Sequence, residues 1–187
     1  MKFMKALAIV VVLLVAVSAG LMLYMGVFSK PSVEEKVMGP YLMAYEPFVG
    51  AYKDTGKVFD KVTKALKAEG IETTRGIGIY YDDPTAVPAS ELKSDCGSIV
   101  EEKDYAAFEK VKGKYQSKTV TQGDCLVSQF PIKNMFSYFV GPMKCYPVMS
   151  KYAESKGMTC GLVYELYDMP GKTIYFVREI TAKPNPK

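Results

Sequence analysis

The sequence predicts an α+β fold in which duplicated β-α-β-β modules form one antiparallel sheet, with two main helices on one face and a cleft on the other. Segments with strand composition and segments with helical periodicity follow one another in the same order in both halves. IGIYYDDP at 77–84 also aligns without gaps on VYELYDMP at 163–170, which matches Tyr81 with Tyr167. An uncharged run at 6–28 predicts one transmembrane helix before the domain.

The first module begins with a strand at Gly39–Tyr52, where Pro47 predicts a bulge or an edge position. A helix follows, because apolar residues recur at helical spacing between an Asp-Thr-Gly start signal and a glycine stop. Two strands complete the module, and a loop containing two prolines separates them. The predicted ranges are Thr55–Glu69 for the helix and Thr74–Asp82 and Cys96–Glu101 for the strands.

The second module repeats this order after a short helix. A hairpin turn at 122–124 is predicted between its first two strands. The long helix contains Pro142 and Pro147, which predict a kink or two segments. The predicted helices are Tyr105–Val111 and Asn134–Lys156, and the strands are Tyr115–Thr121, Cys125–Pro131, Thr159–Tyr167 and Thr173–Thr181.

The apolar run sets the predicted domain organisation. Its 23 residues carry no charge, and a helix needs about 20 residues to cross the hydrocarbon core. A cleavable signal peptide is the alternative, with small residues at 16–19, but the run is long for a signal core. We therefore expect a transmembrane anchor at 1–28, a connector at 29–37, the domain at 38–182 and a tail at 183–187. Lys2 and Lys5 favour a single-pass membrane protein with its domain outside the cytoplasm.

The charge balance and the cysteine spacing argue against some classes of function. Two of the 24 basic residues precede residue 29, so the rest of the chain has 22 basic and 20 acidic residues. That balance argues against a nucleic-acid surface. The chain lacks histidine and any CxxC spacing, so we expect no metal site and no cofactor. Disulfides in an oxidising space and free buried thiols both remain open for Cys96, Cys125, Cys145 and Cys160.

The stretch at 76–97, GIGIYYDDPTAVPASELKSDCG, carries a family resemblance. A strand that ends in YYDDP, a loop with proline and a following CGSIV strand resemble the GyrI-like small-molecule-binding domains, which also serve as effector-binding domains of AraC-type regulators. The resemblance covers roughly residues 39–180. In its anchored layout the chain is similar to membrane-anchored animal members, one of which is a receptor for autophagy of the endoplasmic reticulum. Their domain faces the cytosol, unlike the orientation expected here.

Strand alternation suggests where a ligand could bind. Leu162, Tyr164 and Leu166 share one face of their strand, and Glu165 and Tyr167 share the other. We expect the leucine face to pack on the helices and Glu165 to lie on the open face. The GyrI-like resemblance implies a cleft between the modules and a glutamate at this strand position, so Glu165 takes that role. The candidate ligand-binding residues are Glu165, Tyr52, Tyr81, Tyr167 and Tyr175.

These observations predict a membrane-anchored domain that binds a small, apolar, cationic molecule, since a carboxylate among aromatic rings attracts cations. A plain solvent-facing sheet position is the alternative for Glu165, and half-buried sheet packing is the alternative for the tyrosines. A protein-interaction or adaptor module at the membrane, with a vestigial cleft, is the second functional class. Hydrolysis of strained small molecules is a minor alternative implied by the resemblance. We expect no catalytic residue, because serine and cysteine lack a histidine base.

Overall fold

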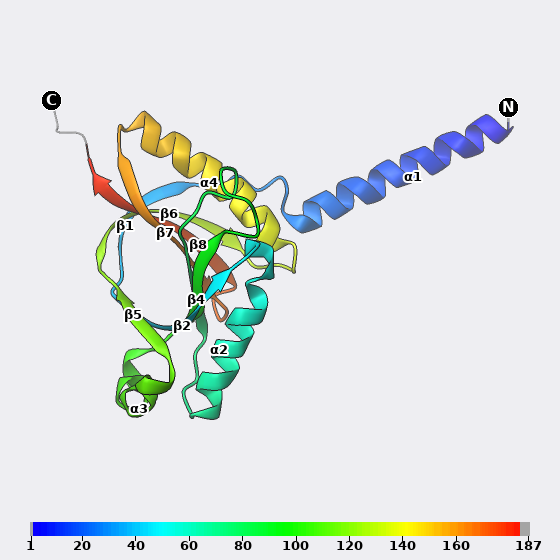
Figure 1. Cartoon of the computed structure of the whole chain (residues 1–187). Coiled ribbons are helices and arrows are strands. Elements are labelled where there is room, and N and C mark those ends of the chain that lie inside the picture. Colours follow the sequence, from blue (N-terminus) through cyan, green and yellow to red (C-terminus); the bar gives the residue numbers. More distant parts are fainter. Residues whose placement is uncertain (1, 184–187) are drawn as a thin grey trace.

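The structure, a computed structural model, describes residues 2–183, apart from the side chains of residues 2, 3, 6 and 8. Eight antiparallel strands form one curled sheet in the order β1-β6-β8-β7-β3-β4-β2-β5 (Figure 1). The α+β class is thus confirmed. The strands are β1 (Val33–Met38), β2 (Tyr41–Val49), β3 (Arg75–Tyr80), β4 (Lys93–Ile99), β5 (Gln116–Val120), β6 (Gly123–Pro131), β7 (Thr159–Asp168) and β8 (Thr173–Ala182). The helices are α1 (Lys2–Met25), α2 (Gly56–Ala68), α3 (Tyr105–Val111) and α4 (Ser137–Ser155).

Two related modules make up this sheet. One is β2-α2-β3-β4 and the other is β6-α4-β7-β8, so each is a β-α-β-β unit. β3 and β7 pair at the centre, and β4 and β8 flank them, followed by β2 and β6. The strand order is therefore the same when it is followed outwards from either central strand, as a duplicated module requires.

The edges of the sheet are joined by two bent strands. β1 runs into β2 through Gly39, and β5 runs into β6 through residues 121–122. Val33 lies opposite Ser128 in the β1–β6 pair, and Tyr41 lies opposite Val120 in the β2–β5 pair. The two bent strands therefore keep the same pairing register on both sides of the bend. A Cβ on Gly39, whose φ is +86°, would lie 2.9 Å from the carbonyl oxygen of Thr121, so only glycine suits this crossing.

This arrangement corrects two predictions about the strands. The predicted hairpin at 122–124 is wrong, because β5 pairs with β2 whereas β6 pairs with β1 and β8. The expected connector at 29–37 contains most of β1. Neither feature has a strong local signal, because both depend on pairing between segments about 80 residues apart in the chain.

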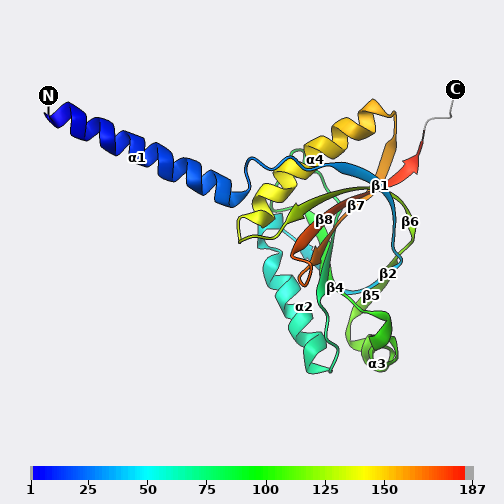
Figure 2. The ribbon, with the colours of Figure 1, turned by 180° about the vertical axis from the view of Figure 1, so that it is seen from behind.

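Side chains on the two faces of the curled sheet form separate cores. The inner core fills the inside of the ring of strands seen in Figure 1, and it includes Tyr164 and Leu166 of β7. Outer cores lie between the sheet and α4 and between the sheet and α2 (Figures 1 and 2). The leucine face therefore packs inside the curl. The prediction that it packs on the helices is wrong, because a curled sheet buries its concave face against itself.

The helices α2 and α4 differ in how well they match the prediction from the sequence. α2 agrees with the prediction to within a residue at each end. α4 is one helix that spans both Pro142 and Pro147, rather than two segments. It approaches the sheet closely at Gly141, where an added Cβ would lie 2.8 Å from the Phe176 ring.

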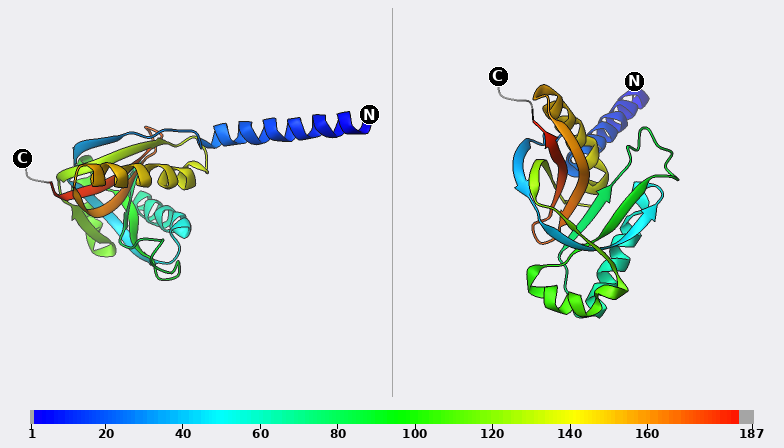
Figure 3. Two further views of the ribbon diagram at one scale, coloured as in Figure 1. Left: turned by 90° about the horizontal axis from the view of Figure 1, so that it is seen from above. Right: turned by 60° about the vertical axis from the view of Figure 1, so that its left-hand side comes forward.

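α1 projects away from the domain in each view (Figures 2 and 3). Over the residues described, the structure contains no helix that is long and apolar enough to cross a membrane. Most of the predicted tail at 183–187 lies outside the described residues.

Candidate ligand-binding site

A cavity lies between α2 and α4, above the central strands β3 and β7. Its volume is about 1470 Å³. Because both helices contribute to its walls, the cavity is on the face of the sheet that carries the helices. The prediction of a cleft on the opposite face is therefore wrong, for the same reason that the leucine face was misplaced.

Each helix lines the cavity with a stripe of side chains at helical spacing. α4 contributes Tyr138, Pro142, Tyr146 and Ser150, which are four residues apart and so share one helix face. α2 contributes Phe59 and Thr63 with the same spacing. The walls thus arise from regular helix geometry, and both helices contribute aromatic side chains to them.

The floor of the cavity depends on two glycines of β3. Ile77 and Ile79 point into the inner core, so Gly76 and Gly78 face the helices. Gly78 lies directly opposite Glu165 in the β3–β7 pair. A Cβ on Gly78 would lie 2.9 Å from the Tyr80 hydroxyl and 3.0 Å from the Phe59 ring. The missing side chain therefore leaves room for these rings beside Glu165.

Glu165 lies at the base of the cavity and is 6% exposed. Tyr146 Oη donates a hydrogen bond of 2.7 Å to Oε1, and Tyr167 Oη donates one of 2.5 Å to Oε2. Tyr167 and Tyr80 share a further hydroxyl hydrogen bond of 2.9 Å. Among the ion pairs within residues 2–183, none includes Glu165. The carboxylate is therefore hydrogen-bonded but forms no ion pair with any residue that the structure describes.

Burial raises the pKa of Glu165, and the hydrogen bonds from Tyr167 and Tyr146 offset only part of that rise. Burial and the neighbouring carboxylate hold the pKa values of Tyr146 and Tyr167 well above the ordinary value for tyrosine. The tyrosines therefore stay protonated as donors. A cation placed beside Glu165 would favour its ionised form.

Aromatic contacts surround this carboxylate. The Tyr167 ring meets the Phe59 ring edge-on, with centroids 5.1 Å apart, and lies 5.9 Å from the Tyr138 ring. Tyr52 and Tyr80 form a second edge-on pair at 4.8 Å. Such rings offer π faces and apolar area to a ligand that carries a positive charge.

Three of the five predicted site residues lie in the base or wall of this cavity: Glu165, Tyr167 and Tyr52. The Tyr52 hydroxyl donates to the carbonyl oxygen of Asp82 at 2.9 Å, which fixes its ring at the cavity wall. Tyr175 packs against the inner core instead, because it lies on the other face of β8. Tyr175 is not one of the described residues that line the cavity.

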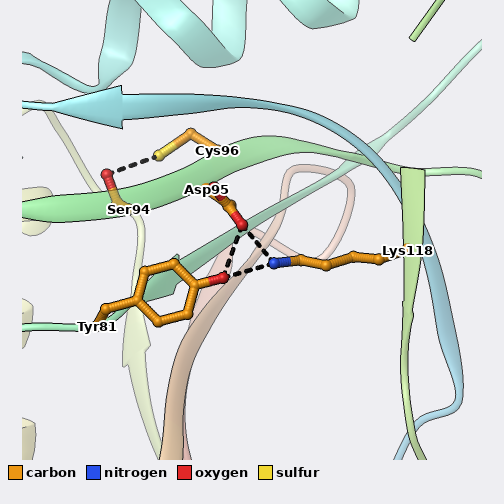
Figure 4. Close-up of polar contacts among 5 residues, drawn as sticks. All are labelled: Tyr81, Ser94, Asp95, Cys96 and Lys118. Atoms are coloured by element: carbon orange, nitrogen blue, oxygen red, sulfur yellow. Dashed lines mark hydrogen bonds and ion pairs between the residues drawn. The ribbon is translucent and has the colours of Figure 1, made fainter. Parts of the chain in front are cut away.

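Tyr81 contributes to the rim of the cavity, but its hydroxyl belongs to a different cluster (Figure 4). Tyr81 Oη donates a hydrogen bond of 2.6 Å to Asp95 Oδ2 and accepts one of 2.6 Å from Lys118 Nζ. Lys118 Nζ also forms an ion pair with Asp95. The internal alignment of Tyr81 with Tyr167 therefore holds for sequence position but not for the direction of the side chain.

Sequence reasoning missed several cavity residues. The cavity lining includes Tyr80, Tyr146, Phe59 and Arg178, which are not among the predicted site residues. The four-residue spacing of Tyr138, Pro142, Tyr146 and Ser150 is a signal that could have identified the α4 wall.

The four cysteines are free thiols in the structure, and three are buried. Burial raises the pKa of Cys96 to about 12 and that of Cys145 to about 11. Cys96 Sγ donates to Ser94 Oγ at 3.6 Å (Figure 4). These two thiols are therefore protonated at neutral pH and are poor nucleophiles.

No family model matches the chain. Among curated proteins, the testis-expressed protein 264 homolog of Mus musculus is 23% identical over 131 residues, which are 67% of this chain and 41% of that protein. Testis-expressed protein 264 of Homo sapiens is 22% identical over 131 residues, with 67% and 40% covered. The chain thus spans about two fifths of the length of these relatives.

Several solved structures have a similar fold. The EcmrR C-terminal domain matches with a TM-score of 0.58 and 10% identity, covering 83% of this chain and 100% of that one. SAV2435 bound to tetraphenylphosphonium matches with a TM-score of 0.53 and 9% identity, covering 81% and 94%. A hydrolase from Listeria innocua matches with a TM-score of 0.53 and 9% identity, covering 80% and 92%. At these identities the likeness is one of fold.

Proposed function

We propose that this domain binds a small, apolar, cationic molecule in the cavity between α2 and α4, with Glu165 as its counter-ion. The observation that carries the proposal is a buried carboxylate that has two tyrosine donors and no ion-pair partner among residues 2–183. Burying an ionised carboxylate is costly unless a charge compensates it, so a cationic ligand gains affinity by supplying that charge.

The shape and chemistry of the walls support an apolar ligand. Phe59, Tyr138 and Tyr167 offer aromatic area around the carboxylate. A protein with a similar fold, SAV2435, was solved with tetraphenylphosphonium, which is an apolar cation. That likeness makes tetraphenylphosphonium a reasonable first probe.

Titration calorimetry with the purified full-length chain tests this function. We expect tetraphenylphosphonium to bind and Glu165→Gln to weaken it by about 1.5–3 kcal/mol, the range for a hydrogen bond to a charged group. Tetraphenylborate has the same shape and the opposite charge, so it should not bind. Glu91→Gln, at an exposed position in the loop before β4, is the control that should leave binding unchanged.

Equal affinities for wild type and Glu165→Gln would refute the role of Glu165. If no apolar cation binds the wild-type protein, the ligand-binding function is wrong and an interaction module at the membrane becomes the better hypothesis. Consumption of a strained ligand at a rate that depends on Glu165 would instead indicate a hydrolase.

We also propose, from the sequence alone, that residues 6–28 anchor the domain to a membrane with the domain outside the cytoplasm. The run is uncharged, and Lys2 and Lys5 precede it. Protease added to intact cells should then remove the domain, and alkaline washing should leave the chain in the membrane fraction. A domain protected until lysis would contradict the orientation, and release by the wash would contradict the anchor.

A further inference from the structure

Arg178 of β8 is one of several charged residues that line the same cavity as Glu165. Arg178 lies opposite Val163 in the β7–β8 pair, and Phe176 lies opposite Glu165. Arg178 and Glu165 are therefore diagonal neighbours on the face of the sheet that carries the helices. Diagonal positions in an antiparallel pair are roughly 7–8 Å apart.

Two successive turns of α4 hold these two side chains apart. Tyr146 donates its hydrogen bond to Glu165, whereas Ser150 Oγ accepts a hydrogen bond of 3.0 Å from Arg178 Nη1. Residues four apart on a helix are separated by about one turn of 5.4 Å along its axis. The carboxylate and the guanidinium thus face one cavity without pairing.

The hydrogen-bonding capacity of Arg178 is largely unused. Its Nε is buried and has no hydrogen-bond partner, and the ion pairs found between residues 2 and 183 do not include this guanidinium. A buried donor without a partner is costly, and a guanidinium offers several N–H groups in one plane. A ligand carboxylate or sulfonate could accept a charge-assisted hydrogen bond from the part of the guanidinium that faces the cavity.

We propose that the ligand is amphoteric, with a cationic centre beside Glu165 and an anionic acceptor at Arg178, joined by an apolar body. This inference rests on the proposed function, because it concerns a second contact in the same cavity. It narrows the ligand from any apolar cation to an apolar molecule that carries two opposite charges at separate positions.

A matched pair of dyes tests this inference with the full-length chain. Rhodamine B carries a carboxylate and a delocalised cation, and its ethyl ester keeps the cation and the apolar body but lacks the negative charge. We expect wild-type protein to bind rhodamine B about tenfold more tightly than the ester, which is the scale of one charge-assisted hydrogen bond. Fluorescence anisotropy gives both dissociation constants.

Variants separate the two contacts. Arg178→Met should remove the preference for rhodamine B by weakening the binding of that dye without weakening the binding of the ester. Glu165→Gln should weaken the binding of both dyes. Ser150→Ala is the control, because it removes the hydroxyl bound by Arg178 and keeps the charge, so the preference should persist. Thermal melting of each variant confirms that it is folded.

The outcomes distinguish failure of the two proposals. If both dyes bind with a dependence on Glu165 but with equal affinity, or if the preference survives in Arg178→Met, the amphoteric ligand is wrong and the cationic one stands. If neither dye binds, or if binding ignores Glu165, both proposals fail.

Discussion

Glu165 and Asp95 are buried carboxylates on opposite faces of the curled sheet, and they differ in their charged partners. Each accepts a hydrogen bond from a tyrosine hydroxyl, Glu165 from Tyr167 and Asp95 from Tyr81. Asp95 also has a cation within the protein, because Lys118 forms an ion pair with it (Figure 4). Among the residues described, Glu165 has no such partner.

This is the difference that we would expect between a structural carboxylate and the proposed binding carboxylate. Lys118 is held over the Tyr45 ring at 4.6 Å and over the Tyr81 ring at 5.3 Å, so the Asp95 cluster is complete in itself. The Glu165 cluster has equivalent aromatic rings and hydroxyl donors but lacks the cation. A ligand that supplies this charge would make the two clusters alike.

The largest effect that we expect concerns stability. Lys118→Met leaves Asp95 without its cation, which should lower the free energy of unfolding by about 1–3 kcal/mol, below the cost for a fully buried pair because Lys118 is partly exposed. Glu165→Gln should not lower it at pH 8. Urea unfolding of both variants measures these values.

The direction of the stability change in Glu165→Gln follows from the pKa of Glu165. Because folding raises the pKa of Glu165, the protonated carboxyl stabilises the folded state below the unfolded pKa of about 4.3, and that stability is lost as pH rises through the folded pKa. At pH 8 the native carboxylate is therefore a cost that glutamine avoids. A large loss of stability in Glu165→Gln at pH 8, or none in Lys118→Met, would remove the contrast between the clusters.

A smaller effect is expected at the cavity floor. The Cβ of Gly78→Ala would crowd the Tyr80 hydroxyl and the Phe59 ring, so we expect a stability loss of about 1 kcal/mol, the lower end for overpacking. Binding of tetraphenylphosphonium should weaken with it. Gly113→Ala is the control, because nothing lies within 4 Å of a Cβ at that position. Tighter binding by Gly78→Ala would show that Gly78 does not provide the space for the ligand.

Much of the fold follows from local pattern. The β3 strand, the α2 helix and the β7–β8 pair were predicted from alternation, helical spacing and turn residues, because each signal lies within a dozen neighbouring residues. The internal match between 77–84 and 163–170 correctly indicated two modules. That the central strands of these modules pair is a finding of the structure. The closure of the sheet by β1 and β5 could not be predicted, since it depends on pairing between distant segments.

The candidate site shows the same division. Alternation correctly grouped Glu165 with Tyr167 and separated both from Leu166. It could not say which face carries the helices, because a curled sheet has an apolar core on each side. Tyr175 packs against the inner core, whereas Tyr81 contributes to the rim of the cavity. Arg178 has no local signal at all, since its place in the cavity is set by the pairing of β8 with β7.

The most direct test of the account is the pKa of Glu165 with and without a cation. Carbon-detected NMR of protein labelled with ¹³C at glutamate side chains follows the titration, and the resonance lost in Glu165→Gln identifies this residue. We predict a pKa above the ordinary value of about 4.3 in the free protein and a lower pKa in the presence of saturating tetraphenylphosphonium, because a bound cation favours the carboxylate. An ordinary pKa in the free protein, or a pKa that the bound cation leaves unchanged, would contradict the claim that Glu165 is the counter-ion of a cationic ligand.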